Sequence, residues 1–188
     1  MEQHTLLSAD TSLLVLIDLQ EKLLPVIQGV EAVTATCEFL LDAAALLDIP
    51  VMATEQYPQG LGGTISSLRT KLRPQNISEK LTFSGADQIC GHIQQCPSVS
   101  TVLLTGIETH ICVQQTALQL LERGLRVQLV LDGVSGRREQ DHLAAISRMQ
   151  AAGVVVGTAE SAVFEWCGSS DHPQFRAISR LVRDRAAA

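Results

Sequence analysis

The sequence predicts an α/β fold in which a parallel β-sheet is covered by helices on both faces. Six short segments are expected to be strands: residues 13–17, 51–54, 77–80, 101–105, 127–131 and 154–156. All but residues 77–80 are mainly apolar. Segments with helical spacing or a helix-ending residue lie between and after them: residues 31–47, 86–95, 112–122, 139–151 and 173–185. Strands that alternate with helices form right-handed βαβ units, and such units build a parallel sheet.

Local composition supports each of these elements. Residues 13–17 (Leu-Leu-Val-Leu-Ile) form a continuous aliphatic run, which is typical of a parallel strand buried on both faces. Residues 31–47 place their apolar side chains on one helical side, and Pro50 favours a helix end just before it. Residues 55–63 hold one proline and three glycines, so we expect a loop there. Gly124 lies just past a predicted helix, where glycine is favoured.

The length of 188 residues fits one domain over residues 1–188, with a core at about 12–165 and a last helix at about 173–185. Hydrophobic residues make up 46% of the chain and aromatic residues only 3%, so we expect an aliphatic core. No apolar run approaches the roughly 20 residues of a membrane span. The first residues lack the basic segment of a signal peptide. We therefore expect a soluble, cytoplasmic protein without a membrane partner.

Charge and cysteine usage narrow the function further. The net charge of −6 argues against a nucleic-acid partner, because phosphate binding needs clustered Lys and Arg. The five cysteines are an odd number without C-x-x-C spacing, which predicts reduced thiols and neither a disulfide framework nor a zinc site. The histidines show no metal-ligand spacing.

Three reactive side chains follow the predicted strands. Asp18 comes directly after the first strand, Lys80 ends the third, and Cys112 follows the fourth after a short turn. Ligands in open α/β folds bind outside the carboxyl ends of the strands. We therefore expect the carboxylate, the ammonium and the thiol to converge at this edge of the sheet.

Each of these residues also has an ordinary structural interpretation: a turn-forming Asp, a solvated Lys or a small core Cys. Cys112 differs from the other thiols because it is expected to open a helix, whose dipole would lower the pKa of a thiol. Lys80 would act in the same direction, and Asp18 could accept the proton. His110 is an alternative base, although we favour a role in the pocket wall.

Four segments resemble the isochorismatase-like cysteine hydrolase family, in family order from about Ser12 to Phe164. They are residues 14–20 (Leu-Val-Leu-Ile-Asp-Leu-Gln), 54–58 (Thr-Glu-Gln-Tyr-Pro), 79–84 (Glu-Lys-Leu-Thr-Phe-Ser) and 106–113 (Gly-Ile-Glu-Thr-His-Ile-Cys-Val). The last is the most specific. The sequence looks most like the branch with an E-Q-Y-P loop, whose members largely lack an assigned substrate.

The resemblance implies a three-layer α/β/α, Rossmann-like fold with a six-stranded parallel sheet. It implies a catalytic triad that falls on Asp18, Lys80 and Cys112. It also implies a cis peptide between Ile107 and Glu108, with the backbone N–H groups of Glu108 and Cys112 facing a substrate oxyanion. Finally, it implies a homo-oligomer.

Departures from the family pattern shape the expected chemistry. Nicotinamidases of the family hold a metal with an Asp and two His after the second strand, whereas residues 55–60 contain no histidine. We therefore expect no metal, no other cofactor and no nicotinamidase activity. Members that cleave the isochorismate vinyl ether typically lack the cysteine, so Cys112 favours covalent attack on a carbonyl-type carbon. The candidate pocket residues are Gln20, Gln56, Tyr57, Phe83 and His110.

The sequence thus predicts a hydrolase that cleaves a small-molecule amide-type C–N bond through a Cys112 thioester. Two alternatives stay open. One is vinyl-ether hydrolysis with Asp18 as the acid, and the other is a catalytically silent scaffolding or redox-responsive homologue. Nucleic-acid cleavage is less favoured because the chain is acidic.

Overall fold

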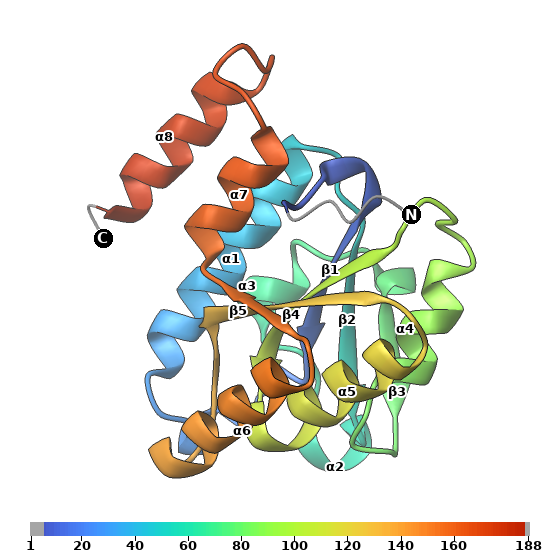
Figure 1. Cartoon of the computed structure of the whole chain (residues 1–188). Coiled ribbons are helices and arrows are strands. Elements are labelled where there is room, and N and C mark those ends of the chain that lie inside the picture. The colour runs from blue at the N-terminus through green and yellow to red at the C-terminus, as the bar shows by residue number, and fades with distance from the viewer. Residues whose placement is uncertain (1–5, 187–188) are drawn as a thin grey trace.

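The computed structural model describes residues 6–186 and shows a central sheet between two layers of helices (Figure 1). Its six strands are β1 (Ser12–Ile17), β2 (Val51–Gln56), β3 (Ile77–Lys80), β4 (Thr101–Ile107), β5 (Arg126–Ser135) and β6 (Val155–Gly157). All neighbouring strands are parallel, in the order β3-β2-β1-β4-β5-β6. The predicted fold class is therefore confirmed.

Eight α-helices accompany the sheet: α1 (Val30–Leu46), α2 (Pro58–Leu61), α3 (Ser66–Arg69), α4 (Ala86–Ile93), α5 (Gln114–Glu122), α6 (Glu139–Ala151), α7 (Ala159–Cys167) and α8 (Phe175–Ala186). One face of the sheet carries α1 with α7 and α8, and the other carries α4, α5 and α6 (Figure 1). None of the helices described between residues 6 and 186 has the length and apolarity needed to cross a membrane.

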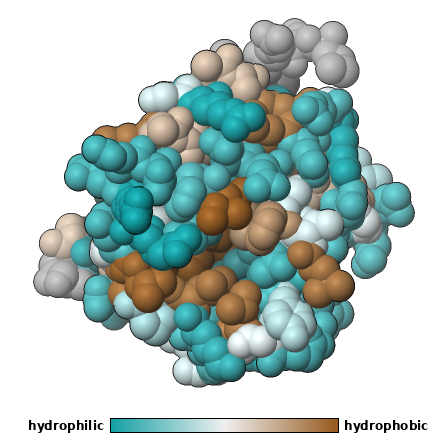
Figure 2. Space-filling model, turned by 90° about the horizontal axis from the view of Figure 1, so that it is seen from below, coloured by the Kyte–Doolittle hydropathy of each residue, from teal (hydrophilic) through white to brown (hydrophobic). Residues whose placement is uncertain are grey.

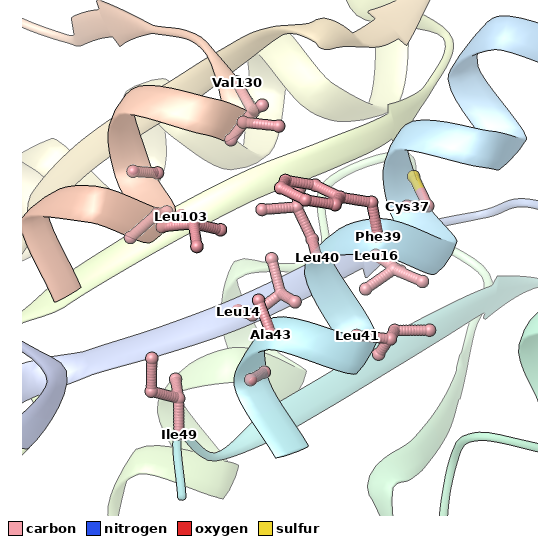
Figure 3. Close-up of a cluster of buried hydrophobic side chains, with 14 of the residues drawn as sticks. Leu14, Leu16, Cys37, Phe39, Leu40, Leu41, Ala43, Ile49, Leu103 and Val130 are labelled. Atoms are coloured by element: carbon pink, nitrogen blue, oxygen red, sulfur yellow. The ribbon is translucent and has the colours of Figure 1, made fainter. Parts of the chain in front are cut away.

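The core lies on both sides of the sheet, so that β1 is buried between its two parts. Leu14 and Leu16 point to the face covered by α1, where they meet Leu40 and Leu41 (Figure 3). Leu13, Val15 and Ile17 belong to the cluster on the opposite face. Side chains along a strand alternate between faces, so the continuous aliphatic run supplies both clusters at once.

The strand order places the candidate site. β1 pairs with β2 on one side and with β4 on the other, and the chain runs outward in opposite directions from these two strands. Such a switch point leaves a crevice at the carboxyl ends of the strands, where connections diverge to the two faces. The segments after β1 and β4, which hold Asp18 and Cys112, therefore meet at the lower edge of the sheet in Figure 1.

Several elements differ from the sequence prediction. β4 continues to Ile107 and β5 continues to Ser135, and the pairing of these two strands shifts register between Leu104 and Gly106. Two short helices, α2 and α3, lie in and after the expected loop. The prediction contained no helix at α7, which is started by a capping box between Thr158 and Ser161.

The expected helix start at Cys112 is also wrong. A π-helical turn, Thr109–Val113, precedes α5, so Cys112 lies inside this turn and two residues before the α-helix. π-helical turns are often found at functional sites. The thiol is therefore held by an irregular turn and not at an α-helix N-terminus.

Gly106 allows β4 to approach β1 at the candidate site. Its φ angle is +107°, and an added Cβ atom would lie 2.1 Å from the carbonyl oxygen of Ile17. Residues other than glycine rarely adopt this conformation, and a backbone atom cannot give way as a flexible side chain can. The close pairing of these two strands therefore requires glycine.

We predict that Gly106→Ala lowers the free energy of unfolding by about 3 kcal/mol or more, because strain and overlap add. Gly91→Ala is the matched control, since Gly91 lies in α4 with a φ outside the positive range and nothing within 4 Å of the added atom. That control should be neutral or stabilising by up to about 1 kcal/mol. Urea unfolding followed by circular dichroism measures both, and equal stabilities would contradict the interpretation.

Candidate active site

Asp18 lies at the carboxyl end of β1 and is fully buried. Its φ angle is +52°, a conformation that Asp tolerates better than most residues. The backbone N–H of Asp18 donates to the Thr54 carbonyl oxygen at 3.1 Å, so the residue is still hydrogen-bonded to β2. Its positive φ angle nevertheless departs from the strand conformation. The carboxylate thus lies at the carboxyl edge of the sheet, where side chains from β2 and β3 reach it.

Lys80 meets this carboxylate from two strands away. Its Nζ atom lies 2.6 Å from Asp18 Oδ2, and both side chains are completely shielded from solvent. The ammonium also donates to Gln56 Oε1 at 2.8 Å and to the carbonyl oxygen of Phe83 at 2.9 Å. A buried charge needs partners of this kind, because an unpaired one costs several kcal/mol. The predicted meeting of Asp18 and Lys80 is present in the structure.

Thr54 and Gln56 on β2 complete the setting of the ion pair. The Thr54 hydroxyl donates to Asp18 Oδ1 at 2.7 Å, which occupies the carboxylate oxygen that Lys80 does not hold. The Gln56 amide accepts from Lys80 and donates to the Leu81 carbonyl oxygen. Sequence reasoning did not select Thr54, although a hydroxyl at the end of a buried strand was an available signal. Gln56, which was expected to line the pocket, is partly exposed and accepts a hydrogen bond from Lys80.

Cys112 lies next to this pair, and its side chain is nearly buried, at 7% exposure. It is close enough to both Asp18 and Lys80 for each to shift its pKa. The Thr116 hydroxyl accepts from the Gly85 backbone N–H and donates to the Cys112 carbonyl oxygen at 2.6 Å. This link joins the turn that carries the thiol to the segment after β3.

The expectation of a lowered thiol pKa is wrong. Burial raises the pKa of Cys112 to about 12, and the negative charge of Asp18 acts in the same direction. Lys80 lowers the pKa, but its effect is smaller. The thiol is therefore protonated at neutral pH, and its reactivity depends on a base that removes the proton during attack.

The strand-to-turn segment before Cys112 has a cis peptide bond between Ile107 and Glu108. The Glu108 carbonyl oxygen accepts from the backbone N–H groups of Ile111 and Val113 inside the π-helical turn. Its carboxylate forms an ion pair with Arg137 at 3.0 Å, just beyond β5. These bonds hold both the carbonyl group and the side chain of Glu108, four residues before Cys112.

The remaining candidate pocket residues divide into two groups. Gln20 is fully buried, and its amide bonds only to backbone groups of Gln56 and Gly62, so it holds the loop after β2 and is not the pocket-lining group expected. Tyr57 and Phe83 are 51% and 56% exposed. They follow β2 and β3 and thus lie at the same carboxyl edge as Asp18, Lys80 and Cys112.

His110 is oriented toward the β5 side of the turn. An added Cβ on Gly136 would lie 3.3 Å from its Nδ1 atom, and its Nε2 atom is 4.0 Å from Asp141 Oδ2. Within residues 6–186 its Nδ1 atom is buried without a hydrogen-bond partner. These contacts fit the role in the pocket wall that we favour for His110. They provide no partner that would orient His110 as a base acting on Cys112.

Figure 2 shows the face at the carboxyl ends of the strands, seen from below relative to Figure 1. Hydrophobic residues gather there around a hollow, with polar residues outside them. In the part of the chain that the structure describes, no group of three or more His, Cys, Asp or Glu side chains is arranged to hold a metal ion.

Comparison with known proteins identifies the family. The model of the Isochorismatase domain family matches residues 12–161, which is most of the chain. The chain belongs to the isochorismatase family. Human isochorismatase domain-containing protein 2 is 39% identical over 177 residues, covering 94% of this chain and 85% of the human protein.

Solved structures place this isochorismatase-family protein among isochorismatase-fold proteins. The MAR1 ribonuclease of Caenorhabditis elegans superimposes with a TM-score of 0.89 at 38% identity, covering 95% of this chain and 93% of the worm chain. YcaC from Pseudomonas aeruginosa, solved with hexane-2,5-diol and covalent acrylamide, has a TM-score of 0.87 at 21% identity and covers 100% of this chain and 96% of its own. At that identity the second likeness shows the fold alone.

We predict that Lys80→Met destabilises this isochorismatase-family protein by roughly 3–5 kcal/mol, because Asp18 is left as a buried unpaired charge. The Asp18→Asn/Lys80→Met double variant removes both charges and should be more stable than Lys80→Met alone. Chemical unfolding of the four proteins in this cycle gives the coupling energy. A double variant that is less stable by the sum of both single losses would contradict the pairing.

The raised pKa of Cys112 also predicts how the thiol responds to pH. From pH 6 to pH 9 its alkylation by iodoacetamide should speed up about tenfold per pH unit, because the thiolate fraction rises at that rate below the pKa. Intact-mass kinetics on a variant with the other four cysteines replaced by serine measures this single site. A rate that levels off near pH 7 would show a thiol pKa that is lowered and not raised.

Proposed function

We propose that this protein hydrolyses a small amide-type C–N bond through a thioester on Cys112. The observation that carries the proposal is the buried Asp18 carboxylate, held by Lys80 at 2.6 Å and Thr54 at 2.7 Å beside a protonated thiol. A base oriented by two fixed partners next to a nucleophile is the arrangement that covalent hydrolysis requires.

In the first step Cys112 Sγ attacks the amide carbon while Asp18 takes the thiol proton. The S–C bond forms, and the carbonyl π electrons move to oxygen. We assign the backbone N–H groups of Glu108 and Cys112 as donors to this oxyanion, where removal of one donor typically costs roughly 3–4 kcal/mol. Lys80 stays protonated and keeps the carboxylate oriented.

In the second step the tetrahedral intermediate collapses. The C–N bond breaks, and Asp18 returns the proton to the leaving nitrogen, so that ammonia or an amine departs from the thioester. Asp18 then takes a proton from water as the water oxygen attacks the thioester carbon. The C–S bond breaks, the acid product leaves, and the proton passes from Asp18 to the Cys112 sulfur. No cofactor is required at any step.

Other activities are less well supported by the site. Vinyl-ether hydrolysis with Asp18 as the acid would leave Cys112 without a role, and a silent homologue would not need the four hydrogen-bond partners of the Lys80 ammonium. The worm relative is described as a ribonuclease, which is a statement about that protein. In this chain the net charge is −6, so we retain a small molecule as the substrate. Self-association and a cytoplasmic location stay predictions.

Trapping of the thioester tests the proposal. We predict that incubation with a panel of small primary amides adds an acyl mass to the wild-type protein at Cys112, and that Cys112→Ala loses both the adduct and amide turnover. Cys90→Ser is the matched control, since Cys90 is a partly exposed thiol in α4, and it should keep both. Full turnover in Cys112→Ala, or activity that survives complete alkylation of Cys112, would overturn the proposal and favour the vinyl-ether route.

A further inference from the structure

A groove of about 580 Å³ lies beside the triad, at the outer edge of the sheet. Its walls come from the start of α2, the end of β3 and the start of α4, and they include Tyr57, Pro58, Lys80 and Leu81. Lys80 therefore contributes its ammonium to the ion pair and other atoms to the groove. A molecule in the groove would lie next to the segment that holds the catalytic ammonium.

The Tyr57 ring is preorganised as one wall of this groove. Tyr57 has a φ angle of +38°, which is uncommon for an aromatic residue and is found mainly where the surroundings impose it. A Cβ atom on Gly60 would lie 2.3 Å from the Tyr57 ring, so the ring covers the glycine directly. The ring is nevertheless 51% exposed, and Leu81 is 77% exposed. An aromatic and an aliphatic side chain are thus both available to a ligand.

The two glutamines beside the ion pair are already used, whereas Gln88, which lines the groove, has a buried amide oxygen without a hydrogen-bond partner among residues 6–186. Gln20 bonds to backbone groups, and Gln56 bonds to Lys80 and to the Leu81 carbonyl oxygen. The Lys80 ammonium is shielded and neutralised by Asp18. What the groove offers near the triad is therefore mainly apolar surface, which favours aliphatic contact.

The groove also carries negative charge. Glu79 and Asp87 both line it. Asp87 pairs with Arg123 at 2.5 Å in an exposed contact, whereas no Lys, Arg or His nitrogen of residues 6–186 lies within ion-pair distance of Glu79. A ligand carboxylate would be repelled here, and an ammonium would be attracted to the carboxylates and to the Tyr57 ring face.

We propose that this groove binds the non-reacting chain of the substrate and that the substrate is a small amide with an aliphatic chain that ends in a neutral or cationic group. The assignment rests on the proposed function for the reacting end. It adds a substrate class to the proposed reaction: amides with an aliphatic chain and no carboxylate at its far end.

Four amides test the assignment: acetamide, pentanamide, 5-aminopentanamide and the half-amide of glutaric acid. The rate of Cys112 acylation, measured by intact mass, should be about tenfold or more higher for pentanamide than for acetamide, because added methylenes are buried. The acylation rate with the cationic 5-aminopentanamide should equal or exceed the rate with pentanamide. The rate with the anionic half-amide should be at least about tenfold lower than the rate with pentanamide. Rates that are independent of chain and charge would overturn the inference while leaving the thioester proposal intact.

Variants locate the effect in the groove. Gly60→Ala displaces the Tyr57 ring and Tyr57→Ser removes it, so both should reduce the preference for pentanamide over acetamide. Glu79→Gln should reduce the difference in acylation rate between the cationic and the anionic amide. Phe164→Ser is the control, because Phe164 is a large residue of similar exposure (41%) on α7, and it should change none of these ratios. A Phe164→Ser protein with the same losses would contradict the assignment.

Binding is measured separately from chemistry in Cys112→Ala protein. Addition of 5-aminopentanamide should shift the amide resonances of Tyr57, Gln59, Gly60 and residues 79–88 in ¹H–¹⁵N spectra, even if no amide acylates the wild type. Absence of such shifts would overturn the groove assignment. If Leu81→Ser instead lowers the molar mass by light scattering and leaves the order of the four amides unchanged, the groove is a contact with a second copy and the inference is wrong.

Discussion

The ion pair between Asp18 and Lys80 is the interaction on which the rest of the site depends. Both charges are removed from water, so each needs several partners in fixed positions. The Thr54 hydroxyl and the Gln56 amide provide them from β2, and the Phe83 carbonyl oxygen provides another from the segment after β3. The loops at this edge are thereby tied to the strands, and the carboxylate faces the thiol in one orientation.

A protonated thiol beside a fixed carboxylate has a chemical consequence. Burial keeps Cys112 neutral in the resting protein, which protects it from unselective alkylation and oxidation. In the proposed mechanism the nucleophile forms only when Asp18 accepts the proton during attack. In the proposed mechanism, selectivity then comes from which amide the neighbouring groove can hold beside the triad, because the thiol has little reactivity of its own.

The topology of the sheet explains why distant residues can share one site. Asp18, Lys80 and Cys112 follow three different strands, and the order β3-β2-β1-β4 brings all three strand ends to one edge. β2 lies between β3 and β1, so Lys80 reaches Asp18 across it, and the residues at the end of β2 become the partners of the pair. Gly106 then allows β4 to approach Ile17 closely enough to carry Cys112 to the same place.

The sequence by itself determined the alternation of strands and helices, the parallel sheet and the three residues at its carboxyl edge. These features depend on local composition and on the rule that parallel strands share an edge. Only the tertiary structure decided the roles of Gln20, Gln56 and Thr54, because hydrogen-bond partners come from other strands. It also reversed the expected pKa shift of Cys112. Burial in a π-helical turn outweighs the nearby Lys80, and the degree of burial is not encoded in the spacing of residues.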